Sequence, residues 1–164
     1  MKKAILFCLM ICVLAFTGCS KPQNSGADVI SSVAWRSLGK GQYNVYMIYG
    51  CPGIIDTAND PKATYNQIEA FLAKAVSYTK SIPKSDNYTE NAGYIGPPYI
   101  TFSNKSHTII ISPAWYVKVT NNTIPVKYVT GVLQVTFDKR SILIQSQSFY
   151  NWLKENKWQT SFHD

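Results

Sequence analysis

The stretch from Tyr99 to Gln145, YITFSNKSHTIIISPAWYVKVTNNTIPVKYVTGVLQVTFDKRSILIQ, decides the fold class of this chain. Trp115, Val117 and Val119 alternate with polar neighbours, and residues 133–137 repeat that alternation. A period of two is typical of strands with one packed face and one wet face. We therefore expect an antiparallel meander. Its strands are predicted at 99–103, 107–112, 114–120, 124–129, 132–138 and 141–145, with turns at Asn104-Lys105, Asn121-Asn122, Thr130-Gly131 and Lys139-Arg140.

A long helix is predicted before this stretch, over residues 61–82. Asp60 is a good N-cap residue, and Pro61 suits the first helical position because its missing N–H has no partner there anyway. Apolar residues then recur at helical spacing, and Pro83 would end the helix. Glu69 lies mostly away from this stripe and should face water.

A short helix is predicted at the C-terminal end, over residues 147–157. Ser148 could cap it, and Phe149, Trp152 and Leu153 would form its inner face. Strands in one run beside helices indicate the α+β class, with an antiparallel sheet packed on one face by helices 61–82 and 147–157. Further upstream, residues 28–36 and 42–50 suggest a β-hairpin around Gly39-Lys40-Gly41.

The first nineteen residues indicate where the protein resides. Lys2 and Lys3 precede a thirteen-residue apolar run, and Thr17-Gly18 precedes Cys19. The run is shorter than the roughly 18 to 20 residues that a membrane-spanning helix needs, so it is typical of a cleavable signal. A cysteine at the cut point resembles the lipobox of bacterial lipoproteins, although Phe16 stands where leucine is usual.

The resemblance implies removal of residues 1–18, lipid attachment at Cys19 and residence on the outer face of the bacterial cell membrane. An ordinary signal with Cys19 incidental is the alternative. Residues 19–27 would form a polar tether, and 28–164 a single α+β domain. A diacylglyceryl group on Cys19 would supply the two chains that stable anchoring requires. The membrane, reached through that covalent lipid, is thus the first expected partner.

Loss of the signal lowers the net charge from +7 to +5. The basic residues are spread thinly, which argues against nucleic acid as a partner. A mild positive charge is better suited to binding an envelope protein or an acidic cell-wall polymer. A charged surface that only keeps the protein soluble would explain it too. Tyrosines 88, 94, 99, 116 and 128 are candidates for a wall-polymer surface or ordinary strand residues.

Catalytic chemistry is poorly represented in the sequence. Cys51 stands alone in a Gly-Cys-Pro-Gly turn, and His107 lies on a predicted strand without a nucleophile motif nearby. The run Asp56–Asp60 fails as a calcium loop because Pro61 stands where glycine is needed. We expect no metal or cofactor and no enzymatic activity, and therefore a binding or interaction domain. The alternatives are an envelope enzyme with a hidden site around Cys51 or His107, and an inhibitor or accessory subunit acting through the long loop 84–98.

Overall fold

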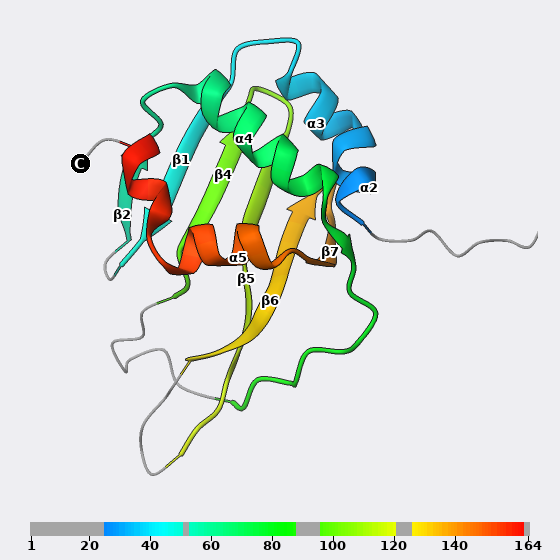
Figure 1. Cartoon of the computed structure of the whole chain (residues 1–164), viewed down its shortest axis with the longest axis vertical. Helices are drawn as coiled ribbons and strands as arrows, with labels where there is room; N and C mark the ends of the chain where they lie inside the picture. The colour runs from blue at the N-terminus through cyan, green and yellow to red at the C-terminus, as the bar shows by residue number, and fades with distance from the viewer. Residues whose placement is uncertain (1–24, 51–52, 88–95, 121–125, 163–164) are drawn as a thin grey trace, which may run out of the picture.

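An antiparallel sheet with helices over one of its faces makes up the fold (Figure 1). The computed structural model describes residues 25–50, 53–87, 96–120 and 126–162. The described sheet has seven strands in the order β2-β1-β4-β5-β6-β7-β3. Its strands are β1 (Asn44–Tyr49), β2 (Ile54–Thr57), β3 (Val76–Ser77), β4 (Tyr99–Ser103), β5 (Thr108–Val117), β6 (Val126–Phe137) and β7 (Arg140–Gln145). The α+β class and the antiparallel meander are thus confirmed.

Fewer and longer strands form the meander than the sequence predicts. Predicted strands 107–112 and 114–120 merge into β5, which continues through an irregularity in register between Pro113 and Trp115. Predicted strands 124–129 and 132–138 merge into β6. The turn predicted at Thr130-Gly131 is wrong, because Gly131 adopts a φ of +73° within the strand and pairing continues on both sides.

The turn between β6 and β7 lies one residue earlier than predicted. Phe137 pairs with Arg140, so the two turn residues are Asp138 and Lys139. Their φ angles are +46° and +62°. Positive φ at both central residues matches the right-handed twist of a two-residue hairpin, so the turn takes this form although neither residue is glycine. The prediction of a turn at Asn104-Lys105 is confirmed, since β4 ends at Ser103 and β5 begins at Thr108.

The core lies between the sheet and the helices. Ile100, Ile111, Val135 and Ile142 form a row of cross-strand neighbours over four strands, and each is buried. The period-two pattern of the sequence thus places one side of β1 and of β4 to β7 in the core. The helices are α2 (Gly26–Ser31), α3 (Val33–Leu38), α4 (Pro61–Ala73), α5 (Gln147–Lys154) and the short 3₁₀ helix η1 (Lys157–Ser161).

The predicted hairpin of residues 28–36 and 42–50 is wrong in its first half, which forms α2 and α3. Ser25 and Asp28 make a capping box, in which the Ser25 N–H donates to Asp28 Oδ2 at 2.6 Å. The Ser32 hydroxyl accepts from the Trp35 N–H at 3.1 Å and starts the second helix. These caps favour helices where the apolar pattern alone was ambiguous. The hairpin partner of β1 is β2.

The long helix is shorter than predicted, because α4 ends at Ala73. The Asp60 cap is confirmed, as its Oδ1 accepts from the Ala63 N–H at 2.9 Å. Beyond the helix, Val76 and Ser77 form β3 at the far edge of the sheet. The Gly26 N–H donates to the Ala75 carbonyl at 3.2 Å, so α2 is fixed to this end of α4. The apolar pattern that predicted a helix continues beyond Ala73, but the residues there include the edge strand β3 instead of a further helical turn.

The C-terminal helix begins as predicted at residue 147, but its N-cap is Ser146 rather than Ser148. Phe149, Trp152 and Leu153 are buried, which confirms the inner face. The helix ends at Lys154, where Asn156 adopts a φ of +54° before η1. The signal region 1–18, Cys19, Cys51, the turn at Asn121-Asn122 and most of loop 84–98 lie outside the described residues.

Candidate functional site

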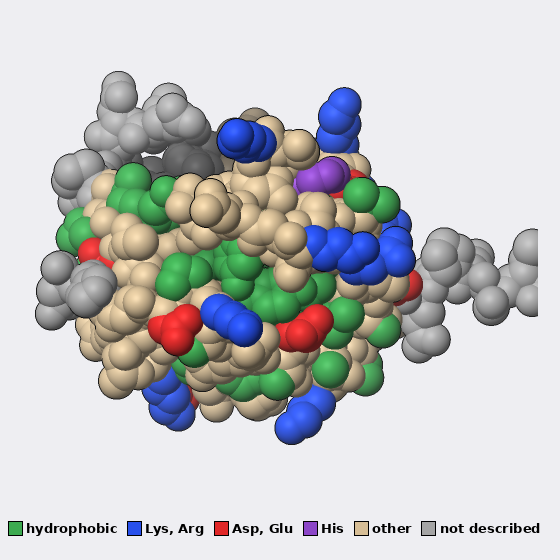
Figure 2. Space-filling model, turned by 90° about the horizontal axis from the view of Figure 1, so that it is seen from above, with side chains coloured by type: hydrophobic (Ala, Val, Ile, Leu, Met, Phe, Trp, Pro, Cys, Tyr) green, Lys and Arg blue, Asp and Glu red, His purple; other side chains and the backbone are tan. Residues whose placement is uncertain are grey.

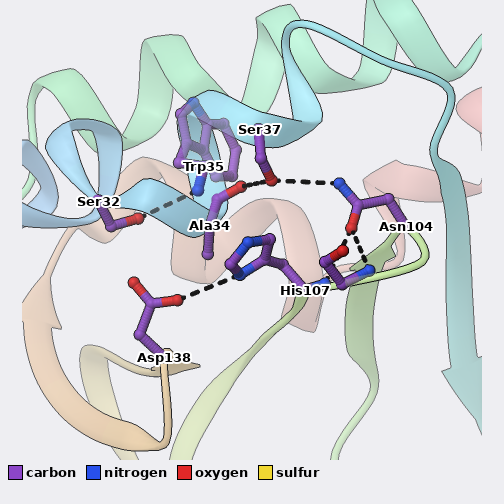
Figure 3. A network of polar contacts seen from close by, with 8 residues as sticks. Ser32, Ala34, Trp35, Ser37, Asn104, His107 and Asp138 are labelled. Atoms are coloured by element: carbon purple, nitrogen blue, oxygen red, sulfur yellow. Dashed lines mark hydrogen bonds and ion pairs between the residues drawn. The ribbon is translucent and has the colours of Figure 1, made fainter.

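His107, one of the catalytic candidates, lies in the β4–β5 turn and faces the β6–β7 turn. Its Nδ1 is 3.5 Å from Asp138 Oδ1, and the two side chains are 27% and 32% exposed (Figure 3). Asn104 organises the turn, since its Oδ1 accepts from the backbone N–H groups of Ser106 and His107 at 2.9 and 2.8 Å. His107 is therefore held between two turns by contacts that fix the loop geometry.

The nearby hydroxyl in this network belongs to Ser37, which has two partners of its own. Its Oγ donates to the Ala34 carbonyl at 2.8 Å and accepts from Asn104 Nδ2 at 3.1 Å (Figure 3). A nucleophilic serine needs its hydroxyl proton directed at a base. Here the proton is directed at a carbonyl of its own helix, so the network joins α3 to the β4–β5 turn structurally.

The largest hollow near this network lies at the same end of the sheet, between α4 and the loop that joins α3 to β1. It has a volume of about 700 Å³ and is lined by residues 39–44 together with Asp60, Pro61, Lys62, Tyr65 and Asn66. Both tyrosines are fixed by their hydroxyls. Tyr43 donates to the Pro61 carbonyl at 3.2 Å, and Tyr65 donates to the Trp35 carbonyl at 3.4 Å.

An aromatic stack supports this hollow from beneath. The Tyr65 ring lies 4.6 Å from that of Trp35 in a stacked arrangement and 5.5 Å from that of Tyr43. Burial raises the pKa of Tyr65 to about 12, with smaller contributions from the nearby charge of Glu69 and from Tyr43. Burial, and then the charge of Asp60, also raise the pKa of Tyr43. Both phenols are therefore neutral donors at physiological pH.

Glu69 takes part in this arrangement and does not simply face water. Its Oε1 accepts from the Trp35 indole N–H at 3.1 Å, and the side chain is half-buried. The prediction that Glu69 faces solvent is therefore wrong. An indole N–H in a core needs a hydrogen-bond partner, and α3 supplies a tryptophan that the sequence pattern had assigned to a strand.

Three smaller hollows continue from the first one across the end of the sheet. Neighbouring hollows share residues: Gln42, Tyr43 and Asn44 join the first to the second, Asn104 and Lys105 the second to the third, and Ser106 and His107 the third to the fourth. We call this set of adjoining hollows the polar trough. It is lined by Lys40, Gln42, Tyr43, Asn44, Asp60, Lys62, Tyr65, Asn66, Ser103, Asn104, Lys105, Ser106, His107, Asp138 and Lys139, with Ser37 at its wall.

Figure 2 looks at this end of the molecule and shows a hollow with an apolar floor. Basic and acidic side chains flank the hollow, and the histidine lies near further basic side chains (Figure 2). Four lysines of the polar trough, Lys40, Lys62, Lys105 and Lys139, are exposed. Its two carboxylates already have partners, because Asp60 caps α4 and Asp138 contacts His107. Because four lysines line the trough against two carboxylates, it carries an excess of positive charge.

Three of the five tyrosines proposed from the sequence for a wall-polymer surface lie in the described residues. Tyr99, Tyr116 and Tyr128 are half-buried strand residues, and Tyr128 lies under Lys154, whose Nζ is 3.8 Å from the ring centre. Tyr88 and Tyr94 lie outside the described residues. Sequence reasoning missed Tyr43 and Tyr65, because it interpreted the first as a strand residue and the second as core. The signal that could have found the site was the cluster of amide residues beside Gly39-Lys40-Gly41.

Part of loop 84–98 is fixed against the outer end of β5. The Asp86 N–H donates to the Val117 carbonyl at 3.0 Å, and Asp86 Oδ2 accepts from the Val119 N–H at 2.9 Å. The Ser85 hydroxyl accepts from the Val117 N–H at 3.1 Å. This segment lies beside the lower end of β5 in Figure 1, away from the polar trough.

Within the described residues, no three potential metal-ligating side chains come together. None of the helices described is long and apolar enough to cross a bilayer. Neither protein-family models, nor curated proteins, nor solved structures gave a match to this chain.

Proposed function

We propose that this protein is a lipid-anchored extracytoplasmic protein of a bacterial envelope, with a non-catalytic binding domain whose binding surface is the polar trough. The binding role is supported by a contrast between polar groups of the trough that hold the fold together and lysines of the trough that do not. The Ser37, Asn104 and His107 groups are engaged in contacts that hold turns and helices together. The trough lysines have no carboxylate partner among the described residues, which leaves them available to a ligand.

The anchoring role rests on Cys19 and on the distance between it and the fold. The Gly26 N–H is bonded to the Ala75 carbonyl, so the chain is attached to the fold at a position seven residues after Cys19. Seven extended residues span at most about 25 Å. A domain lipidated at Cys19 would therefore remain close to the bilayer surface, where it meets polymers of the inner wall before any soluble partner further away.

The anchor is tested by growing bacteria that express the full chain with a radioactive fatty acid. The wild-type protein should carry label and fractionate with membranes. A Cys19→Ala variant should carry none and remain a longer, unprocessed chain. The signal cysteines Cys8 and Cys12 provide the matched control, because Cys12→Ala should leave the label unchanged. Label on the Cys19→Ala protein would contradict the proposal.

The absence of catalysis is tested at His107, the candidate that the structure describes. His107→Gln should leave the binding of any ligand of the trough within a few-fold of wild type, because the side chain can still bridge the two turns. If a survey of envelope hydrolase substrates finds turnover that His107→Gln abolishes, the protein is an enzyme and the proposal fails.

A further inference from the structure

We infer that the ligand of the polar trough is an acidic polysaccharide chain, an inference that rests on the proposed binding function. The first argument is shape. The four joined hollows run from the N-terminal end of α4, past the α3–β1 loop, to the β4–β5 and β6–β7 turns. A small molecule would fill one of them, whereas a linear polymer can occupy them in succession.

The second argument is the hydrogen-bonding chemistry of the lining. The side-chain amides of Gln42, Asn44 and Asn66 have no hydrogen-bond partner among the described residues, and each lines the largest hollow. An amide offers two donors and an acceptor with two lone pairs. Groups that both donate and accept match the hydroxyls of a sugar, each of which also does both. Ser103 and Ser106 continue this pattern along the trough.

The third argument is charge. The four exposed lysines are distributed along the trough: Lys40 and Lys62 line the first hollow, Lys105 lines the second and third, and Lys139 lines the fourth. Spaced single lysines match a chain that carries one negative group per sugar or two, rather than a single compact anion. Opposite charge along the whole length would also raise the rate of encounter with such a chain.

The aromatic stack distinguishes this ligand from single-stranded nucleic acid. Proteins that bind single strands present aromatic ring faces on which the bases stack. Here Trp35 occupies one side of the Tyr65 ring and Tyr43 packs close to it as well, so Tyr65 is buried and presents no free face. The stack acts as a rigid floor, and recognition falls to the amides and lysines above it.

The test measures binding of the purified full chain, in a nonionic detergent, to alginate oligosaccharides as the acidic polysaccharide. Neutral dextran oligosaccharides and single-stranded DNA of similar length are the comparison probes. We expect alginate to bind, dextran to bind at least tenfold more weakly and DNA to bind more weakly than alginate. Alginate binding should weaken with added salt because exposed charges are screened.

Two variants, each with four lysines replaced by glutamine and therefore with the same change of net charge, locate the site. The first replaces Lys40, Lys62, Lys105 and Lys139 with glutamine. The second replaces Lys74, Lys80, Lys84 and Lys127, which are exposed and lie outside the trough. Because single exposed ion pairs are weak, only the summed loss is informative, and we expect about tenfold weaker alginate binding for the first variant. The second should bind within about twofold of wild type.

Equal loss in both variants, or no binding of alginate by the wild type, would overturn the inference. Binding of DNA that is as tight as that of alginate, or tighter, would also overturn it. The trough would then be a surface that binds polyanions without specificity. These failures are distinguishable from failure of the proposed function, because fatty-acid labelling at Cys19 is read independently. A non-catalytic anchored protein with a different ligand would keep the label and lose only the alginate result.

Discussion

Replacing Gly26 with alanine tests how the N-terminal helices are attached to the fold. A Cβ at this position would lie 1.9 Å from the Leu72 carbonyl oxygen and 2.7 Å from its carbonyl carbon. Both atoms belong to the backbone of α4, so no side-chain rotation can relieve the contact. Either the backbone shifts, which costs about 1–3 kcal/mol for overpacking, or α2 separates from α4.

The second route has a similar cost. Separation of α2 would expose Val29, which is fully buried, and losing a buried valine costs about 1.5–3 kcal/mol. Both routes therefore lead to a loss of about 2 kcal/mol in the free energy of unfolding. With a urea dependence of about 2 kcal/mol per molar, the midpoint of urea unfolding should fall by about 1 M.

The matched control is Gly53→Ala. A Cβ there would meet Ile48 Cγ2 at 3.5 Å, which is an ordinary contact, and Gly53 is exposed. Urea unfolding followed by tryptophan fluorescence should give a midpoint close to wild type for this variant. Equal midpoints for Gly26→Ala and Gly53→Ala would refute the argument that close backbone contact attaches α2 to α4.

Three further predictions concern other parts of the fold. The raised Tyr65 pKa, about 12, means that the folded state favours the neutral phenol; stability from this group is complete below pH 10 and is lost as the pH rises from 10 to 12. Tyr65→Phe should show a smaller fall in unfolding free energy over that range in urea titrations, and an unchanged slope would disprove the cause. Lys139→Gly should raise the unfolding free energy by about 1 kcal/mol, because Lys139 has a φ of +62°; a lower melting temperature would contradict this. Trp35→Phe should cost about 1–2 kcal/mol by removing the indole donor to Glu69, and an unchanged urea midpoint would show that water replaces it at no cost.

The meander was predictable because its side-chain pattern has a period of two, which few other structures share. The cap residues Asp60 and Pro61 located the start of α4 for the same local reason. What the sequence could not show was where each element ends. The apolar spacing after Ala73 fits a helix, yet the chain leaves α4 to pair Val76 with Gln145 on β7. That pairing is a long-range contact, which no local pattern contains.

The N-terminal helices show a second limit. Apolar residues from Val29 to Trp35 fit a short strand or two short helices equally well. The choice is made by serine caps and by the packing of Trp35 against Tyr65, which comes from a segment thirty residues later. The polar trough was hidden for the same reason. Its residues come from α3, the α3–β1 loop, α4 and two turns, and only the folded chain brings their amides and lysines together.

The central claim is that the polar trough binds an acidic sugar chain, and a titration followed by NMR tests it most directly. Alginate oligosaccharide would be added to ¹⁵N-labelled protein while the side-chain amide signals of Gln42, Asn44 and Asn66 are observed. We expect these signals to shift together and to saturate at the same ligand concentration, while backbone amide signals of residues 115–117 of β5 and 126–128 of β6, at the opposite end of the sheet, stay unchanged. Shifts confined to that opposite end of β5 and β6, or no shifts at saturating alginate, would contradict the claim.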